Sequence, residues 1–348
     1  MKSILQYIKI RPIELNDLDS LHLLAHEAKP GLTSLSKDKS ILFDMISDSL
    51  RSFSKSIQKV ENEFYLFACE DVYNNKLIGC SSIYSQVGIK YPFYSYRIES
   101  IERHSSILDS PSIVTLLHPE ISYNGPSEIG TLFLSEPYRH SGIGRLLSLS
   151  RFLYIRQHQN RFKPSIIAEM RGVSDEHGNS PFWNSLGKRF FKIPFIMADR
   201  LSTLDKQFIA ELLPRFPIYT NFLSQSAQSV ISKTHPATKG ALKLLLNEGF
   251  YITNNIDIFD GGPKVMCNSS DIKTVKDSKF VKIKKINQLP KNTKYYIIAS
   301  QDNYFSSSLQ PISFLSSDEI IIESSTSNLL NVSLNDTVLI SNPYGETL

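Results

Sequence analysis

The chain has 348 residues, of which 41% are hydrophobic and 21% are charged, and its formal net charge is +4. A chain of this length has room for two or three domains with a large buried core. The small net charge argues against a nucleic-acid-binding protein, and no apolar run approaches the roughly 20 residues that a membrane-spanning helix needs. The N-terminal residues carry charges too early for a signal peptide, so we expect a cytoplasmic protein.

The three cysteines are widely spaced and include no Cys-x-x-Cys pair, which argues against a disulfide framework and against a zinc knuckle. His22 and His26 lie one helical turn apart, a spacing that could ligate a metal ion. Because no third ligand lies near them in the sequence, we interpret both as surface histidines and expect no metal site.

The N-terminal part predicts a strand followed by two helices. Residues 8–10 read as a strand that stops at Pro12, and the leucines of residues 18–25 recur on one helical face. A second helix is expected at residues 37–53. The connecting loop, residues 31–35, either covers a substrate or simply joins the two helices.

The next part predicts an antiparallel hairpin and an aromatic segment. Residues 64–70 and 76–87 are apolar and β-branched, and Asn74-Asn75 between them is a turn signal. Residues 91–106 are rich in tyrosine and phenylalanine. We interpret these aromatics as core or interface rather than as a base-stacking platform, because basic residues are not interleaved with them. Arg97 is a charged exception within the segment.

The centre of the chain, residues 127–152, reads as a strand, a short turn and a helix. The turn carries Arg139, Gly142 and Gly144. Glycines expose backbone N–H groups, and a helix N-terminus adds a positive dipole end, so the turn suits a phosphate or pyrophosphate. A Gly-x-Gly pair alone is a weak signal. The order strand, turn, helix strengthens it, and the missing Gly-Lys-Ser/Thr and third glycine disfavour a P-loop and a dinucleotide fingerprint.

A second buried strand is predicted at residues 165–172, one helix after the first, which makes a βαβ unit with parallel strands. Glu169 and Arg171 fall at its carboxyl end, where ligands gather in open α/β sheets. A carboxylate between apolar neighbours is costly unless it is paired. Glu169 is therefore either half of a structural ion pair with Arg171 or a substrate contact.

The following stretch is expected to be mostly helical. A helix at residues 181–187 ends at a glycine, and residues 190–197 return as a strand. Further helices are predicted at residues 206–213, 222–233 and 237–247. Residues 256–262 read as a strand running into a glycine turn, with Asp257 and Asp260 near its end.

Two larger features organise the second half. The order helix, glycine, aromatic strand occurs at residues 183–191 and again at residues 242–251, which suggests two similar closing units. From residue 265 onward the pattern changes to short strands with serine-rich and asparagine-rich turns, without a helix, as in a small closed barrel. We therefore expect two domains, residues 1–264 and residues 265–348.

The Arg-x-x-Gly-x-Gly turn after a strand resembles the acyl-CoA pyrophosphate loop of the GNAT superfamily of N-acetyltransferases. Longer strings resemble the arginine N-succinyltransferase family over roughly residues 8–265. These strings are GLTSL (31–35), SEIGTLFL (127–134), SRFLY (150–154), AEMRGVSDEHGNSPFWNSLGKRFF (168–191), FIAELLPRFPIY (208–219), THPAT (234–238) and IDIFDGGP (256–263). The resemblance implies an α/β (α+β) fold with a GNAT-like mixed central sheet and flanking helices, organised as two GNAT-like halves if the repeat holds, and a small C-terminal β-barrel-like module.

The resemblance also implies an enzyme, an acyltransferase that moves succinyl from succinyl-CoA to the α-amino group of L-arginine, with ornithine as a second acceptor. Succinyl-CoA would be a cosubstrate, with no bound cofactor, no nucleic acid and no membrane partner. A homo-oligomer or a hetero-oligomer is left open. Gly130 departs from the family, whose members tend to carry a side chain there, and this change could loosen the acyl pocket.

The family's proton donor corresponds to His235, and its succinyl-CoA site corresponds to Leu132, whose backbone N–H would hold the oxyanion of the tetrahedral intermediate. Arg139, Gly142 and Gly144 would bind the pyrophosphate. Without the resemblance, a histidine before proline at a helix junction would be read as structural.

The substrate contacts rest on charge alone. A guanidinium calls for a carboxylate, which Glu169, Asp257 or Asp260 could supply, and the succinyl carboxylate calls for a cation, which Arg171 or Arg97 could supply. Each of these residues could equally be ion-paired scaffold. Two further functions stay open: a GNAT-type acyltransferase with another acyl-CoA or amine, and a non-catalytic acyl-CoA-binding module.

Overall fold

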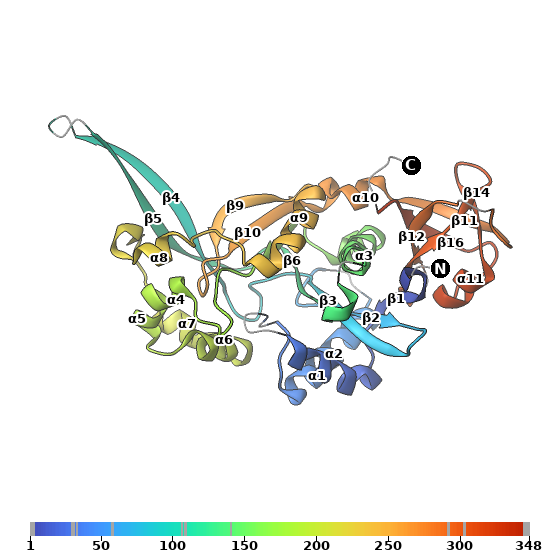
Figure 1. Cartoon of the computed structure of the whole chain (residues 1–348), viewed down its shortest axis with the longest axis horizontal. Helices are drawn as coiled ribbons and strands as arrows, with labels where there is room; N and C mark the ends of the chain where they lie inside the picture. The colour runs from blue at the N-terminus through green and yellow to red at the C-terminus, as the bar shows by residue number, and fades with distance from the viewer. Residues whose placement is uncertain are drawn as a thin grey trace.

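The computed structural model describes residues 4–28, 32, 34–56, 59–105, 107, 110–139, 141–290, 293–301 and 304–343. Within these residues, sixteen strands form one mixed sheet in the order β14-β15-β11-β16-β12-β13-β1-β2-β3-β6-β7-β10-β9-β4-β5-β8. Helices flank the sheet, and the molecule is elongated, with the C-terminal strands at one end (Figure 1). The predicted mixed α/β sheet with flanking helices is therefore confirmed.

The N-terminal elements follow the prediction. They are β1 (Ile8–Pro12), α1 (Leu18–Glu27), α2 (Lys39–Ser54), β2 (Phe64–Asp71) and β3 (Lys76–Tyr84). Asn75 has a φ of +50°, which asparagine tolerates better than most residues, and it turns β2 into β3. Gly31 and Thr33, in the loop that either covers a substrate or simply joins the two helices, lie outside the described residues.

A long hairpin projects from the other end of the molecule (Figure 1). It consists of β4 (Phe93–Ser105) and β5 (Ser110–Ser122), and the two-residue β8 (Ile218–Tyr219) pairs with β5 at the sheet edge. At its base Tyr94 and Tyr96 are buried in one apolar cluster with Phe182 and Trp183. The interpretation of these aromatics as core is confirmed there.

The centre of the sheet is the predicted βαβ unit: β6 (Ser127–Leu134), α3 (Ile143–Gln157) and β7 (Ser165–Glu169). The two strands are parallel, but they pair only where Ser127 and Glu128 face Ile166 and Ile167. Beyond that point β6 and β7 diverge toward their carboxyl ends, so a gap opens in the sheet.

The helical part contains α4 (Pro181–Ser185), α5 (Gly187–Phe191), α6 (Phe195–Leu204), α7 (Gln207–Leu212), α8 (Gln225–Gln228) and α9 (Lys239–Asn247). The strand predicted at residues 190–197 is wrong, because residues 190–191 belong to α5 and residues 195–197 belong to α6. Gly187 does not end the helical run: a Cβ there would come within 2.2 Å of the Trp183 ring, so this glycine allows close packing.

Two further expectations fail in the same part. Within residues 222–233 only α8 is an α-helix, capped by the Ser224 hydroxyl, and Ser232 has a φ of +57°, which breaks the helical run. The helix–glycine–strand order is found at residues 242–251, where β9 (Tyr251–Ile256) follows Gly249, but not at residues 183–191. Residues 183–191 therefore do not match the unit at residues 242–251.

Residues 256–262 do not form the predicted strand. β9 ends at Ile256, residues 257–260 form a turn, and β10 (Pro263–Asn268) returns antiparallel to β9 and to β7. The Asp257 carboxylate accepts the backbone N–H groups of Phe259 and Asp260, and this side-chain bonding favours a turn over a strand.

The C-terminal part contains α10 (Lys273–Asp277), β11 (Lys279–Ile286), β12 (Tyr295–Ser300), β13 (Ser307–Pro311), β14 (Ser313–Phe314), β15 (Glu319–Ile322), α11 (Ser324–Leu330) and β16 (Thr337–Ser341). The expectation of strands alone was wrong, since α10 and α11 are helices too short for sequence periodicity to reveal. The two-domain division at residue 264 stays a prediction. That boundary falls inside β10, and β13 pairs with β1.

Different helices cover the two faces of the central sheet, so the two sides of the gap between β6 and β7 have different surroundings. On one face α3 packs against residues such as Ile129, Ile166 and Val265. On the other face α1 and α2 pack against Leu66, Phe133 and their neighbours. In the part of the chain that is described, no helix combines the length and the apolar character needed to cross a membrane.

Candidate active site

The strand β6 carries a β-bulge beside the gap. Cys80 pairs with Phe133 and Ser82 pairs with Gly130, so the single residue between them on β3 faces both Thr131 and Leu132. Thr131 has a φ of +49°, which is unusual for a β-branched residue. Its hydroxyl accepts a hydrogen bond from Ser82 Oγ at 2.8 Å. The bulge redirects the backbone at Leu132, the residue expected to hold the oxyanion.

The glycine turn lies at the N-terminus of α3. Gly142 is the N-cap residue and has a φ of +88°, a left-handed conformation that requires glycine there. Gly144 follows in the first helical turn. Arg139 is held by its Nε, which donates to the Leu134 carbonyl oxygen at 2.9 Å, and its guanidinium lies over the Phe133 ring. The turn has the form expected of an anion-binding helix start.

His235 lies at the carboxyl end of β7. Its backbone N–H donates to the carbonyl oxygen of Arg171 at 2.8 Å, and Gly172 and Thr234 form an isolated β-bridge. Its Nδ1 accepts the backbone N–H of Ala237 at 3.1 Å. An Nδ1 that accepts a hydrogen bond is unprotonated, so in the neutral ring Nε2 carries the proton. The ring is therefore oriented as a proton donor through Nε2.

Charged side chains gather on the face of the sheet opposite α3. Ile129, Ala168 and Met170 pack on the α3 side, so Glu128, Glu169 and Arg171 project from the other face. Lys264 of β10 pairs in register with Glu169, and its Nζ lies 3.9 Å from Glu169 Oε1. The Lys264 side chain is only 8% exposed, and its Nζ lies 4.3 Å from the centre of the Phe93 ring.

The electrostatics of this cluster favour an added cation. Burial raises the pKa of Glu169 well above its usual range; Lys264 opposes this effect, and the neighbouring Asp257 adds to it. Burial likewise raises the pKa of Glu128. Glu169 Oε1 is buried and has no hydrogen-bond partner. A cationic ligand would give it one and would favour its ionised form.

Asp199 of α6 belongs to the same surroundings. Burial raises the pKa of its carboxyl group to about 7; the charge of Asp257 adds to this, and the charge of Arg171 opposes it. Asp199 is thus close enough to Asp257 and Arg171 to feel the charges of both.

Asp260 has a structural part in the site. Its two carboxylate oxygens accept the backbone N–H groups of Gly172 at 2.7 Å and Gly262 at 2.8 Å, and the residue is 7% exposed. These bonds tie the end of β7 to the turn before β10. Asp257 has one oxygen occupied by backbone N–H groups of its own turn.

The two arginines expected at the acyl carboxylate lie in different places. Arg171 is at the end of β7: its guanidinium donates to Ser174 Oγ at 2.7 Å, while its buried Nε has no hydrogen-bond partner. Arg97 belongs to the projecting hairpin, where it forms an ion pair with Glu120 at 2.9 Å. The structure brings Arg171 together with Glu169 and His235, and it leaves Arg97 outside the charged cluster.

Sequence reasoning overlooked Glu128, Lys264 and Arg151. Each is a charged residue among apolar neighbours, which was the signal in the sequence that could have found it. Only the tertiary pairing shows that Glu128 and Lys264 flank Glu169. Arg151 is 2% exposed in the middle of α3.

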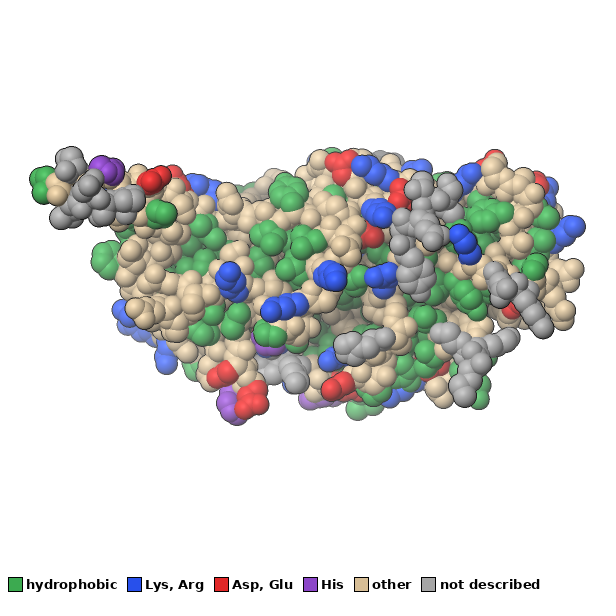
Figure 2. All heavy atoms as spheres, turned by 45° about the horizontal axis from the view of Figure 1, so that its top comes forward, with side chains coloured by type: hydrophobic (Ala, Val, Ile, Leu, Met, Phe, Trp, Pro, Cys, Tyr) green, Lys and Arg blue, Asp and Glu red, His purple; other side chains and the backbone are tan. Residues whose placement is uncertain are grey.

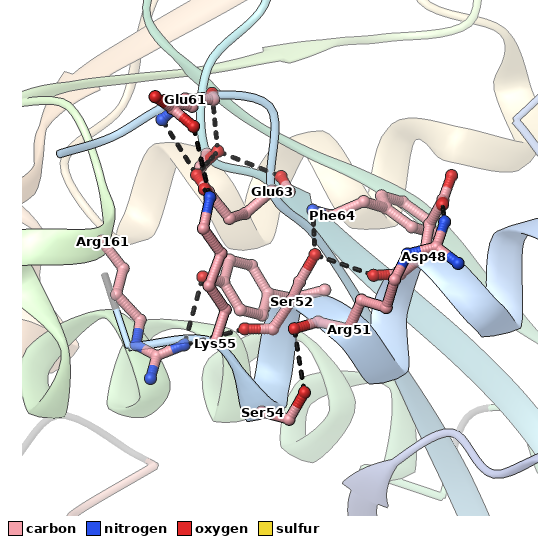
Figure 3. Close-up of polar contacts among 11 residues, drawn as sticks. Asp48, Arg51, Ser52, Ser54, Lys55, Glu61, Glu63, Phe64 and Arg161 are labelled. Atoms are coloured by element: carbon pink, nitrogen blue, oxygen red, sulfur yellow. Dashed lines mark hydrogen bonds and ion pairs between the residues drawn. The ribbon is translucent and has the colours of Figure 1, made fainter. Parts of the chain in front are cut away.

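A separate cavity lies away from this cluster. It has a volume of about 930 Å³ and is lined by residues that precede β6 and β7, such as Asn124 and Lys163, and by the end of α2. Figure 3 shows its polar wall, where Lys55 points toward Glu61 and Glu63. The same view shows Arg161, which is not a lining residue and donates to the Ser52 carbonyl oxygen near the end of α2. The gap between β6 and β7 opens toward the opposite ends of these strands.

Comparison with known proteins identifies the family. The family model described as "Arginine N-succinyltransferase beta subunit" matches residues 8–274. The chain belongs to the arginine N-succinyltransferase family. The resemblance and the acyltransferase class inferred from the sequence are thereby confirmed.

Within the arginine N-succinyltransferase family, two curated relatives named arginine N-succinyltransferase come from Escherichia coli, strain K12 / DH10B and strain SMS-3-5. Each is 42% identical over 275 residues, which cover 79% of this chain and 80% of the relative. A solved structure, arginine/ornithine succinyltransferase subunit AI from Pseudomonas aeruginosa, has a TM-score of 0.88 and 29% identity. The match covers 98% of this chain and 99% of the Pseudomonas aeruginosa chain, so the similarity includes the C-terminal part.

Proposed function

We propose that this chain transfers the succinyl group of succinyl-CoA to the α-amino group of L-arginine. The observation that supports arginine as the acceptor is the order of the charged residues at the carboxyl end of β7. Glu169 and Arg171 project from one face, two residues apart, which is about 6.6 Å along a strand. The α-carboxylate and the guanidinium of an extended arginine molecule are about 7 Å apart, given bonds of roughly 1.5 Å.

The acidic end of the cluster suits the guanidinium. Glu169 Oε1 has no hydrogen-bond partner, and Glu128 and Asp257 add negative charge around it. A guanidinium offers five N–H donors in a plane and binds carboxylates in a fork geometry. It would also offset the burial, and the smaller repulsion from Asp257 and Glu128, that raise the pKa of Glu169.

The basic end suits the α-carboxylate. Arg171 has a buried Nε without a hydrogen-bond partner, and its backbone carbonyl holds His235. An arginine bound in this direction would have its α-amino group next to its α-carboxylate, close to His235. The acceptor nitrogen would then face the gap between β6 and β7.

The donor would lie in that gap. Its pyrophosphate would occupy the turn of Arg139, Gly142 and Gly144, and its thioester would lie at the bulge of β6, where the backbone N–H of Leu132 would hold the developing oxyanion. This arrangement places the donor and the acceptor at the same end of β6 and β7.

The chemistry balances with one histidine. The α-ammonium first loses a proton to solvent, and the neutral amine attacks the thioester carbon to form a tetrahedral intermediate with its negative charge near Leu132. Collapse breaks the C–S bond. In the same step Nε2 of His235 donates its proton to the departing CoA sulfur and takes up the proton of the still positively charged nitrogen of the intermediate, so that the ring stays neutral. The products are N-succinylarginine and CoA.

A steady-state assay of CoA thiol release tests the proposal. We expect turnover with succinyl-CoA and L-arginine, and kcat/KM lower by ~10²-fold or more for norleucine, which lacks the distal cation, and for agmatine, which lacks the α-carboxylate. Ornithine is included because the Pseudomonas aeruginosa relative is named for both amino acids. Thiol release that arginine does not stimulate would reject the proposal.

A further inference from the structure

Arg151 is a buried cation without a counter-charge. It is 2% exposed, and its three hydrogen bonds go to neutral acceptors: Ser148 O at 3.3 Å, Ser148 Oγ at 3.0 Å and Gly130 O at 3.4 Å. It forms no ion pair with any described carboxylate, and burial alone lowers its pKa to about 9. A guanidinium has five N–H donors, so two are left over. Burying an unpaired charge is costly unless a partner arrives.

The position of Arg151 relates it to the acyl donor. Its guanidinium reaches the carbonyl oxygen of Gly130, which lies just past the last paired residues of β6 and β7 and two residues before Leu132. It approaches from the α3 side of the sheet, whereas Glu128 and Glu169 project from the other side. Arg151 is thus beside the gap but on the face opposite the acceptor charges.

A second buried polar group lies near the same point without a partner. Ser81 is fully buried, and its hydroxyl makes no hydrogen bond to any residue that the structure describes. It is the residue of β3 that faces the bulge at Thr131 and Leu132. Cys80 packs on the α1 and α2 side and Ile83 on the α3 side, so Ser81 projects toward α3, the side of Arg151. Unsatisfied buried groups are uncommon and call for an explanation.

We infer that Arg151 receives the free carboxylate of the acyl group, with the Ser81 hydroxyl as an additional donor, and that this pair selects a dicarboxylic acyl-CoA. The inference rests on the proposed function, because it assumes that the thioester lies at Leu132. It adds the residue that distinguishes a charged acyl chain from an uncharged one, a role that neither Arg171 nor Lys264 would have on the acceptor side.

The lengths agree with this assignment. In a succinyl group three C–C bonds of roughly 1.5 Å separate the thioester carbon from the carboxylate carbon, about 4 Å when extended. A charge-assisted hydrogen bond adds about 2.8 Å. Two residues of a regular strand span roughly 6.6 Å, and the bulge at Thr131 shortens the span from Gly130 to Leu132, so a length of about 7 Å is sufficient. An acetyl group would be too short to reach the guanidinium.

The test compares two donors of equal chain length, succinyl-CoA and butyryl-CoA, with arginine as the acceptor. In Arg151→Met the ratio of kcat/KM for succinyl-CoA to that for butyryl-CoA should fall by ~10²-fold or more, because the carboxylate loses its partner while butyryl never used it. Ser81→Ala should lower the ratio by about tenfold. Arg156→Met, which removes a half-buried arginine one and a half turns further along α3, should leave the ratio unchanged.

An unchanged ratio in both Arg151→Met and Ser81→Ala would overturn the inference, as would an equal loss with both donors, which would mean a structural role. Thermal melts check that Arg151→Met folds. If Arg151→Met does not fold, Arg151→Lys takes its place. Lysine keeps the positive charge but lacks the two-pronged guanidinium, so the ratio should still fall. A ratio equal to that of the wild type in both Arg151→Lys and Ser81→Ala overturns the inference.

Calorimetric binding of the two acyl-CoAs without an acceptor separates this inference from the proposed function. If the wild type binds succinyl-CoA more tightly than butyryl-CoA but does not transfer the acyl group to arginine, the acceptor assignment fails. The role of Arg151 can still be measured, as the loss of this binding preference in Arg151→Met. A wild type without preference in binding or in turnover overturns the inference.

Discussion

The backbone N–H of His235 donates a hydrogen bond to the carbonyl oxygen of Arg171 at 2.8 Å. Although 64 positions separate them in the sequence, this bond places the imidazole at the carboxyl end of β7, beside Glu169 and Arg171. The proposed proton donor and the proposed acceptor contacts therefore lie at the end of one strand. The effect of a substitution at His235 can be compared with that of a substitution at Glu169 or Arg171.

The first prediction concerns His235 itself. His235→Asn removes the acid, but its side-chain oxygen can still accept the Ala237 N–H, so the local cap is kept. We expect kcat to fall by ~10²-fold or more, while the Kd for succinyl-CoA stays the same. Stopped assays of thiol release and calorimetry give the two quantities. A wild-type kcat in this variant would reject His235 as the proton donor.

The second prediction concerns the glycine turn. Gly142→Val places a β-branched side chain at a φ of +88°, next to Leu5, and this strains the start of α3. KM for succinyl-CoA should rise at least tenfold, while KM for arginine changes little. Gly240→Val is the matched control, since a Cβ at Gly240 in α9 meets nothing within 4 Å. Equal KM values for succinyl-CoA in the two variants would argue against the turn as the pyrophosphate site.

The third prediction concerns pH and the acceptor. Burial raises the pKa of Glu169; Lys264 opposes this effect, and Asp257 and Glu128 add to it, so the free protein holds a proton on this group more tightly than an exposed carboxylate would. A guanidinium favours the ionised form, so arginine binding releases protons, and KM for arginine should fall as pH rises toward the raised pKa. In Glu169→Gln this dependence should weaken and KM should rise. If the variant keeps the wild-type pH profile, Glu169 is not the group that responds.

The fourth prediction concerns stability at the cavity wall in Figure 3. Glu63 is 4% exposed and accepts hydrogen bonds from Lys55, from the Glu61 N–H and from Ser85 Oγ. Burial alone would raise its pKa, but these bonds outweigh burial and hold the pKa below its usual value. Glu63→Gln should lower the free energy of unfolding by about 1–3 kcal/mol at neutral pH.

The sign of the pH dependence follows from that depressed pKa. The ionised carboxylate stabilises the folded state above the unfolded-state pKa, and this contribution is lost as pH falls through the lower folded-state pKa. The difference between the wild type and Glu63→Gln should therefore shrink in acid. Denaturant unfolding at several pH values measures it, with Glu61→Gln as an exposed control that should cost less. A difference that is constant with pH would contradict the role assigned to the charge.

The surface agrees with the modest charge of the sequence. On the face seen in Figure 2, the lysine and arginine side chains of the described residues form separate spots rather than one continuous patch. The net charge of +4 is spread out, and the charges that matter for the proposed chemistry are the partly buried ones around Glu169 and Arg171.

The sequence by itself determined the elements whose signals are local. The turn at Asn75, the glycine start of α3 and the βαβ order depend on backbone conformations and periodicities that neighbouring residues set. The family strings likewise pointed to His235, which no local physical argument would have chosen. By contrast, local patterns misread residues 190–197 and 222–233, because tertiary packing around Gly187 and a left-handed Ser232 decided those conformations.

Only the tertiary structure decided how the charged residues are sorted. Strand alternation and register place Glu128, Glu169 and Lys264 together on one face, separate Arg97 from them, and put Arg151 beneath the opposite face. Register depends on pairing between segments that are as far apart as residues 169 and 264, and no local pattern encodes it. The physical reason is that a buried charge is costly unless it has a partner, and only the three-dimensional structure shows which buried charges have one.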